Sequence, residues 1–234
     1  VTNTNDAPTV TSAIADASTA EDASYSLNAA AAFTDVDSSD TLTYTMSGAP
    51  STLSISSGTI SGTPLNADVG AHTIIVTATD GSNAAVSDTF ILTVTNTNDA
   101  PTVANAIADA STAEDAAYTL SLSNVFTDVD TGDSCTYSMS GAPSTITLSS
   151  GTISGTPVNA NVGTHTIVVT CTDGSSAAVS DTYVLTVTNT NDAPTVTSAI
   201  ADASTAEDAS YSLNAAAAFT DVDSGDSLTY TMSG

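Results

Sequence analysis

Residues 96–103 read Asn-Thr-Asn-Asp-Ala-Pro-Thr-Val, and the same residues stand at 3–10 and at 189–196. Successive copies are 93 residues apart. An alternating apolar run that includes Phe90 and Val94 leads into residue 96. The proline removes a backbone donor and fixes φ, so a strand should stop there. The stretch is therefore an oxygen-rich joint between successive repeats.

The period of 93 residues sets the domain organisation. It exceeds the roughly 20 to 50 residues of a solenoid repeat and suits one small domain of about 100 residues. We expect 1–7 to end a preceding repeat, 8–100 and 101–193 to be complete repeats, and 194–234 to be the first half (strands A to C) of a third. The chain opens in mid-pattern, which favours a window on a longer polypeptide; the alternative is that another chain supplies the missing strands.

Within each repeat the pattern is typical of strands. Apolar and polar residues alternate, Thr and Val are frequent, and Gly, Pro, Asn and Asp recur about every ten residues. In the first repeat we expect a turn at 15–18, one helical turn at 29–32, and strands at 9–14, 25–27, 42–46, 53–55, 72–78 and 90–94, with a short strand between the two glycines of 58–64. Seven short antiparallel strands predict an all-β fold, with tandem immunoglobulin-like β-sandwiches.

The charge balance excludes several classes of partner. The chain has 26 acidic residues, no Lys and no Arg, for a net charge of −26. Nucleic acid is excluded because phosphate binding depends on Lys and Arg, and an anionic membrane surface is disfavoured. No run approaches the roughly 18 apolar residues of a membrane span. Clustered carboxylates would repel, so any cluster requires bound cations; the alternative is a solvated acidic surface.

Four motifs carry a family resemblance. They are Phe-Thr-Asp-Val-Asp-x-x-Asp-x-Leu-Thr-Tyr at 33–44, Gly-Thr-Ile-Ser-Gly-Thr-Pro at 58–64, Thr-Ala-Thr-Asp-Gly at 77–81 and Asn-x-Asn-Asp-Ala-Pro at 96–101. In this order they resemble dystroglycan-type cadherin-like repeats, which belong with the immunoglobulin-like repeats of large bacterial surface proteins. The resemblance covers the whole chain and implies cadherin-like sandwiches joined end to end.

The resemblance also implies calcium at each junction, about three ions per junction. The first domain would supply Glu21 and, at a motif that departs from the family's Asp-Arg-Glu, Asn66 and Asp68. The linker and the next domain would supply the rest. Over all junctions the implied metal ligands are Asn3, Asn5, Asp6, Glu21, Asp35, Asp37, Asp68, Asp80, Asn96, Asn98, Asp99, Glu114, Asp128, Asp130, Asp173, Asn189, Asn191, Asp192, Asp221 and Asp223.

The chemistry of these residues supports calcium independently. Calcium takes six to eight carboxylate, amide and carbonyl oxygens, and no Cys/His cluster suits zinc. The alternative is that Asp-x-Asp and Asp-Gly are ordinary turn formers. We assign Asp40 and Asp133 to loop capping and leave Asp22 and Asp115 solvated. Because Asn161 replaces Asp68 in the second repeat, the second junction is expected to hold calcium less tightly.

The cysteines, histidines and short motifs of the chain give no sign of catalysis. Cys135 and Cys171 replace Leu42 and Ala78 of the first repeat, on strands that neighbour each other in this architecture. Either they form a disulfide or they are two small buried thiols. His72 and His165 are read as structural or surface histidines. No nucleophile elbow, phosphate loop or cofactor fingerprint is present, so no enzyme is expected.

The leading interpretation is a structural segment of a secreted, calcium-rigidified surface or filament protein. Its partners would be like repeats of the same or neighbouring chains. One alternative is a binding module for homophilic or carbohydrate adhesion to cell-surface glycans, although aromatic residues are only 5% and Trp is absent. Another is a non-catalytic spacer of a larger extracellular enzyme. All three place the chain outside the cell.

Overall fold

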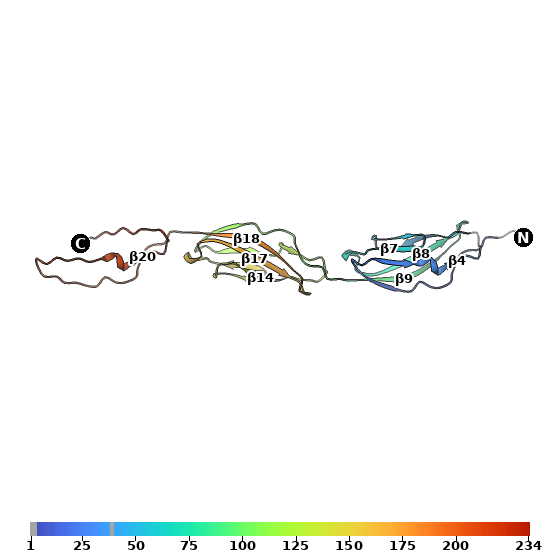
Figure 1. Ribbon diagram of the computed structural model, residues 1–234, viewed down its shortest axis with the longest axis horizontal. Helices are drawn as coiled ribbons and strands as arrows, with labels where there is room; N and C mark the ends of the chain where they lie inside the picture. Colours follow the sequence, from blue (N-terminus) through green and yellow to red (C-terminus); the bar gives the residue numbers. More distant parts are fainter. Residues whose placement is uncertain (1–3, 38–39) are drawn as a thin grey trace. The chain divides into compact units, whose positions relative to one another are not determined.

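The computed structural model describes residues 4–37 and 40–234 of the chain. Contacts divide the chain into two compact units. The first comprises residues 1–99 together with 129–132, and the second comprises 100–128 together with 133–234. Asn3, one of the expected ligands, lies outside the described residues. Each unit is shown with its strands in Figure 1.

The first unit folds as two facing sheets. A four-stranded sheet has the order β2-β9-β8-β5, a three-stranded sheet has the order β3-β7-β6, and β1 pairs with β4. The strands are β1 (Thr9–Val10), β2 (Ala17–Ala20), β3 (Tyr25–Asn28), β4 (Phe33–Thr34), β5 (Thr43–Ser47), β6 (Leu53–Ser56), β7 (Thr59–Gly62), β8 (Gly70–Thr79) and β9 (Ala85–Thr95), with 3-10 turns η1 (Ala29–Ala32) and η2 (Asn66–Asp68).

The second unit repeats this order. Its sheets are β11-β18-β17-β14 and β12-β16-β15, and β10 pairs with β13. The elements are β10 (Thr102–Val103), β11 (Ala110–Ala113), β12 (Tyr118–Ser121), β13 (Phe126–Thr127), β14 (Thr136–Ser140), β15 (Ile146–Ser149), β16 (Thr152–Gly155), η3 (Asn159–Asn161), β17 (Gly163–Thr172) and β18 (Ala178–Thr188). The expected all-β, immunoglobulin-like architecture is confirmed.

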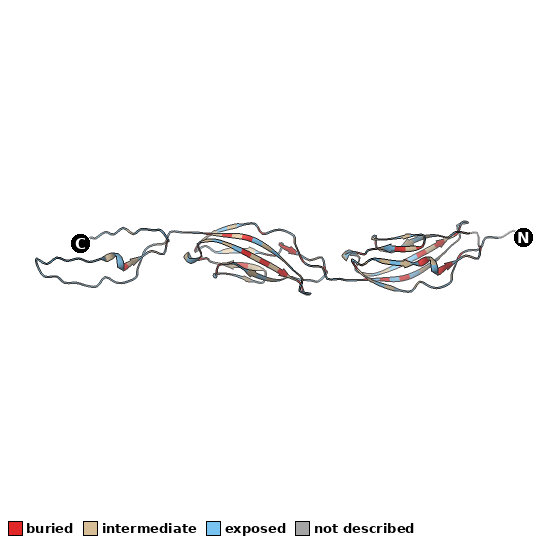
Figure 2. Ribbon diagram, in the orientation of Figure 1, coloured by how far each residue is buried: buried red, intermediate tan, exposed pale blue. Residues whose placement is uncertain are grey.

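The two-residue alternation of β8 and β9 places the core. Ile74 and Val76 on β8 are fully buried, and so is Leu92 on β9, while Ile75 between them is 40% exposed. Figure 2 shows buried and exposed residues alternating along these strands. His72 is on the inward row but only half-buried, at the start of β8. The alternation is that of a sheet with one solvated face, and it places the core on the other face.

One expected turn is a strand. The sequence predicts a turn at residues 15–18, but Ala17–Ala20 form β2, which pairs in parallel with β9. Two aspartates replace the missing ladder bonds just before it. Ile14 N donates to Asp88 Oδ2 (2.6 Å) and Ile91 N donates to Asp16 Oδ1 (2.7 Å). The prediction is wrong because parallel pairing of a short Ala-Ser-Thr-Ala segment leaves no alternating signal.

The third repeat folds less than expected. The sequence predicts strands A to C within 194–234, but only β19 (Thr195–Val196) pairs with β20 (Phe219–Thr220), beside the turn η4 (Ala215–Ala218). Tyr211 and Tyr230 are about half exposed, at 54% and 49%. Residues 194–234 do not extend to the positions that match β7 and β9, with which β3 and β2 pair in the first repeat.

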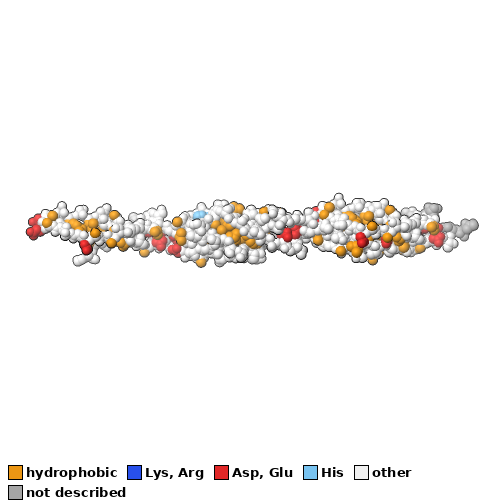
Figure 3. Space-filling model, turned by 90° about the horizontal axis from the view of Figure 1, so that it is seen from below, with side chains coloured by type: hydrophobic (Ala, Val, Ile, Leu, Met, Phe, Trp, Pro, Cys, Tyr) orange, Lys and Arg blue, Asp and Glu red, His pale blue; other side chains and the backbone are white. Residues whose placement is uncertain are grey.

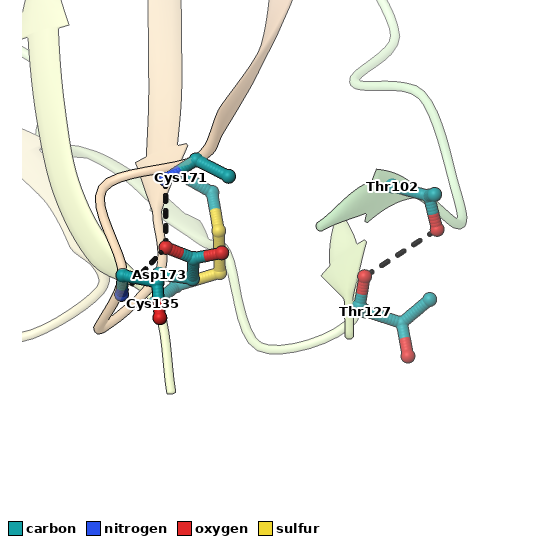
Figure 4. The surroundings of a disulfide bond; sticks show 7 residues. Thr102, Thr127, Cys135, Cys171 and Asp173 are labelled. Carbon is teal, nitrogen blue, oxygen red and sulfur yellow. Dashed lines mark hydrogen bonds between the residues drawn. A yellow bond between two sulfur atoms is a disulfide. The ribbon is translucent and has the colours of Figure 1, made fainter. Parts of the chain in front are cut away.

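A disulfide joins β17 of the second unit to the residue directly before β14. The sulfur atoms of Cys135 and Cys171 are bonded, with Cα atoms 5.1 Å apart. Cys171 lies on β17, and Cys135 directly precedes β14, its neighbour in the sheet. Figure 4 shows Asp173 beside the bond. In the first unit Ala78 is buried and Leu42 packs against the core, so the two repeats fill equivalent positions differently.

Reduction of the disulfide is expected to destabilise the second repeat alone. The bond closes a loop of 36 residues, which is worth about 3 to 4 kcal/mol in the chain-entropy model. Intact mass and urea unfolding, each with and without reductant, would measure this. The double variant C135L/C171A carries the residues of the first repeat and should behave like the reduced protein. An intact mass that does not change on reduction would contradict the bond.

Candidate metal centres

The described acidic residues gather into groups. Five sets of three carboxylates have ligand atoms within 4.8 Å of one another. Figure 3 shows acidic side chains as separate small groups on a face without Lys or Arg. The sets are the Glu21 group (Glu21, Asp99, Asp130), the Glu114 group (Glu114, Asp192, Asp223), the Asp80 group (Asp35, Asp40, Asp80), the Asp173 group (Asp128, Asp133, Asp173) and the Asp226 group (Asp221, Asp223, Asp226).

Backbone hydrogen bonds fix Glu21 at the end of β2. Glu21 N donates to Thr95 O (3.0 Å), which continues the pairing of β2 with β9. Asp22 follows with φ of 57°, a left-handed conformation that Asp tolerates better than most residues. Asp22 N donates to Pro64 O (2.8 Å). The chain therefore turns directly after Glu21 and leaves its side chain at the end of the sandwich.

The Glu21 carboxylate is buried and half satisfied. The residue is 1% exposed. Oε1 accepts from Thr97 N (3.0 Å), whereas Oε2 is buried without a hydrogen-bond partner. A buried carboxylate oxygen without a partner is costly. Two further carboxylates lie within reach of it, and each pair at this separation repels by roughly 3 kcal/mol at an effective dielectric near 20. A bound cation would relieve both penalties.

The linker and the Asp-x-Asp loop complete this group. Asp99 N donates to Asp130 Oδ2 (2.7 Å), and the amide of Asn66 on η2 donates to Asp130 Oδ1 (2.9 Å). Asp130 is 6% exposed. Although its sequence belongs to the second repeat, the segment 129–132 falls in the first compact unit. All three carboxylates of the Glu21 group therefore lie in one unit.

The Glu114 group repeats this geometry in the second unit. Glu114 is 2% exposed, Oε1 accepts from Thr190 N (2.8 Å), and Oε2 is again without a partner. Asp192 N donates to Asp223 Oδ2 (2.6 Å), and the amide of Asn159 donates to Asp223 Oδ1 (3.2 Å). Burial raises the pKa of Asp192, and the carboxylates of Asp223, Asp115, Glu114 and Asp221 raise it further.

Two other groups lie at the β8–β9 and β17–β18 turns. Asp80 is 4% exposed, and the Asn5 amide (3.0 Å) leads the hydrogen bonds that lower the pKa of its carboxyl. Burial raises the pKa of Asp40, with added repulsion from Asp35, Asp37 and Asp80. In the Asp173 group, Asp173 Oδ1 accepts from Ser175 N (2.9 Å) and Ala177 N (2.8 Å). These turn bonds orient one carboxylate toward its group.

Asp68 does not join any of these groups. Its Oδ2 accepts from Thr52 Oγ1 (2.7 Å) and Leu65 N (3.0 Å), and the Leu65 and Thr52 donors lower its pKa. Asn161 Oδ1 accepts the equivalent bonds from Thr145 Oγ1 (2.9 Å) and Val158 N (3.1 Å). The carboxylate thus caps a 3-10 turn, which an amide does equally well. This removes the ligand-based reason to expect weaker calcium binding at the second junction.

The other expected ligands are placed around the groups. The Asn5 amide donates to Asp80 of the Asp80 group, and Asp6 N donates to Asp37 Oδ2 (2.8 Å), which lies in the Asp-x-Asp loop but in none of the groups. Asn98 and Asn191 each donate to the carbonyl of the following aspartate. Asn189 donates to Asp223 Oδ1 (3.0 Å). Of the expected residues, the structure gathers these in carboxylate groups: Glu21, Asp35, Asp80, Asp99, Glu114, Asp128, Asp130, Asp173, Asp192, Asp221 and Asp223. Asn96 is exposed and directly follows β9, at the start of the linker.

Asp40 and Asp133, expected from the sequence to cap their loops, are both members of carboxylate groups, as is Asp226. A sequence pattern marks all three residues. Each is the third acid of an Asp-x-Asp-x-x-Asp stretch, as at 35–40. Asp40 N does donate to Asp37 O (2.9 Å), so the capping interpretation describes the backbone and misses the side chain.

The geometry now permits comparison with known proteins. A family model described as "Putative Ig domain" matches residues 7–95 and 100–188. The chain belongs to this family. A relative in Staphylococcus aureus strain MRSA252, the "Serine-rich adhesin for platelets", is 38% identical over 152 residues, which is 63% of this chain and 11% of that protein. The counterpart in strain MSSA476 is equally similar over 6% of its length. The chain thus spans only 6 to 11% of these relatives.

Solved structures place this Ig-domain chain near cadherins in fold. Mouse cadherin-23 domains EC22–24 match with a TM-score of 0.54 and 18% identity, over 79% of this chain and 65% of that one. Protocadherin gamma B2 domains 1–5 match with a TM-score of 0.50 and 18% identity, over 84% and 43%. At this identity the likeness concerns the fold alone. Among the described residues, no helix is long and apolar enough to cross a membrane.

The raised pKa values predict an unusual pH dependence in chelator. An acid whose pKa is raised by folding stabilises the folded state below its unfolded pKa, and this contribution is lost as pH rises through the folded pKa. Asp40 and Asp192 are of this kind. The metal-free protein should therefore gain stability as pH falls from neutral toward the ordinary titration range of aspartate.

Asp68 and Asp80 affect stability in the opposite direction, because folding lowers their pKa values. Such a group stabilises the folded state above its unfolded pKa, and this contribution is lost as pH falls through the folded pKa. Urea unfolding in chelator over this pH range would measure the net effect. Saturating calcium should abolish the gain, because it favours the charged carboxylates. Metal-free stability that only declines on acidification would contradict the assignment.

Proposed function

We propose that this chain is a structural segment of an extracellular surface or filament protein whose repeats are stiffened by calcium. The observation that carries the proposal is the buried, partnerless Oε2 of Glu21, repeated at Glu114. Membership of an immunoglobulin-like family and similarity to a staphylococcal adhesin support a place on a cell surface. The segment would act mechanically, by spanning distance or by building a fibre or matrix.

The donor chemistry favours calcium. With no Lys or Arg, the chain has only two histidines that could carry a positive charge, so cations from solution must balance clustered carboxylates. All ligand atoms in the groups are carboxylate oxygens. Calcium accepts such oxygens in variable number and geometry, whereas magnesium demands near-octahedral sites and zinc prefers nitrogen and sulfur. Extracellular modules bind calcium with Kd of about 10⁻⁴ to 10⁻³ M.

Residues expected at the first junction fall into two groups that share no residue, the Glu21 group and the Asp173 group. This supports about two ions there rather than the three of the sequence count, one ion for each set of three carboxylates. The Asp80 group would bind its ion in the same way with Asn5 nearby. The Asn-x-Asn-Asp linker contributes mainly Asp99 and backbone donors.

Stiffening follows from where the ligands stand in the sequence. Glu21 belongs to the first repeat, Asp99 to the linker and Asp130 to the second repeat. An ion bound to all three would restrict the backbone torsions between residues 96 and 130. Without the ion, three like charges at this distance repel and the linker torsions gain freedom. The same argument applies to Glu114, Asp192 and Asp223.

Adhesion is the second candidate, favoured by the name of the staphylococcal relatives. Because the match spans only 6 to 11% of those proteins, platelet binding is not carried over to this chain. Homophilic contact with like repeats or binding of cell-surface glycans would be the form that adhesion takes here. In both candidates the segment is non-catalytic and lies outside the cell, and a spacer in a larger extracellular enzyme would have the same structure.

Removal of one buried glutamate should remove one calcium site. The variant E21Q keeps an oxygen but loses the charge, and we expect calcium affinity at this site to fall roughly tenfold or more. The matched control is D22N, because Asp22 is the exposed neighbour and lies in none of the described groups. Calorimetric titration would measure both. Equal calcium binding by wild type and E21Q would contradict the proposed site.

Calcium should also change the length of the chain in solution. We expect small-angle scattering of the wild type to give a longer, narrower distribution of distances with calcium than with chelator. E21Q in calcium should resemble the chelator state, while D22N should follow the wild type. The same distribution with and without calcium would count against stiffening, even if calcium binds.

A further inference from the structure

The turns η2 and η3 each present an asparagine amide to a ligand aspartate. Asn66 on η2 donates to Asp130 Oδ1 (2.9 Å), and Asn159 on η3 donates to Asp223 Oδ1 (3.2 Å). Outer hydrogen bonds of this kind orient ligating carboxylates, and their loss typically costs about 10- to 100-fold in metal affinity. The position of each turn therefore matters to its cation site.

Apolar packing does not hold these turns in place. The residues that flank η2 are exposed, with Leu65 at 52% and Val69 at 40%. Those that flank η3, Val158 and Val162, are 43% and 40% exposed. Because these flanking side chains are exposed, the geometry of each short turn depends on its hydrogen bonds.

A histidine on the following strand supplies one of these bonds. His72 Nε2 lies 2.6 Å from Asp68 O, and His165 Nε2 lies 2.7 Å from Asn161 O. A carbonyl oxygen can only accept, so Nε2 carries the hydrogen and donates. The imidazole thus ties the last residue of the turn to the start of β8 or β17. The side chain of Asp68 or Asn161 closes the other end of the turn.

We propose that His72 and His165 are positioning residues for the two cation sites: each holds a 3-10 turn so that its asparagine amide orients a ligand aspartate. The inference rests on the proposed cation binding at the Glu21 and Glu114 groups. The two repeats support it independently. The acid-to-amide change from Asp68 to Asn161 leaves the histidine bond and the cap intact. The histidines touch no cation themselves and act through the turn.

The test is a calcium titration of the full chain followed by the amide resonances of Thr97 and Thr190. These amides bond to Glu21 and Glu114 and report each site separately. We expect H72A to weaken calcium binding at Thr97 by about tenfold and to leave Thr190 unchanged, with H165A doing the reverse. H72Q can still donate from its amide and should restore most of the affinity. T73A, on the exposed face of β8, is the control.

A double variant separates positioning from general stability. In N66A the amide is gone, so adding H72A should cause no further loss of affinity. If the histidine were merely structural, adding H72A would weaken calcium binding by N66A as much as it weakens binding by the wild type.

Wild-type affinity in H72A at the Thr97 site, or an additive loss in the double variant, would overturn the inference while leaving the cation sites standing. If H72A does not fold, the inference rests on H72Q and N66A; wild-type affinity in N66A would overturn it. No calcium response at Thr97 in wild type would instead refute the proposed function.

Discussion

The structure depends on carboxylates that the chain cannot neutralise by itself. Glu21 and Glu114 are almost fully buried, each with one oxygen bonded to a linker amide and the other without a partner. Most proteins would place an Arg or Lys nearby, but this one has neither. In the proposed function, the compensating charge comes from cations in solution. This single constraint links composition, the acidic joints and the behaviour of the chain as its ionic surroundings change.

Much of the fold could be predicted from the sequence because it depends on patterns among residues close together in the chain. Alternation in β8 and β9, the prolines that follow each linker, and the 93-residue period together predict an immunoglobulin-like tandem. Glu21 lies in one carboxylate group with Asp130 of the Asp-x-Asp loop, and Asp128 of that loop lies in another. The repeats strengthen the prediction, because the residues around Glu21 and Glu114 match position by position along the sequence.

What sequence could not supply were contacts between residues far apart in the chain. The parallel pairing of β2 with β9 joins segments 75 residues apart. Asp68 could be a ligand or a cap, and only the positions of Thr52 and Leu65 decide for the cap. Asp40 could cap its loop or join Asp80, and it does both. In residues 194–234 the alternation persists, but of the strands expected there only β19 and β20 form.

The parallel pairing of β2 and β9 has a mechanical consequence. A pull along the polypeptide enters this sheet through the N-terminal side of β2 and leaves through the C-terminal side of β9. In a parallel pair these are opposite ends, so tension slides the strands past each other. The pairs from Ala17 with Leu92 to Ala20 with Thr95 then bear the load together. Such a ladder yields in shear, with several bonds breaking at once, rather than opening one bond at a time like a zipper.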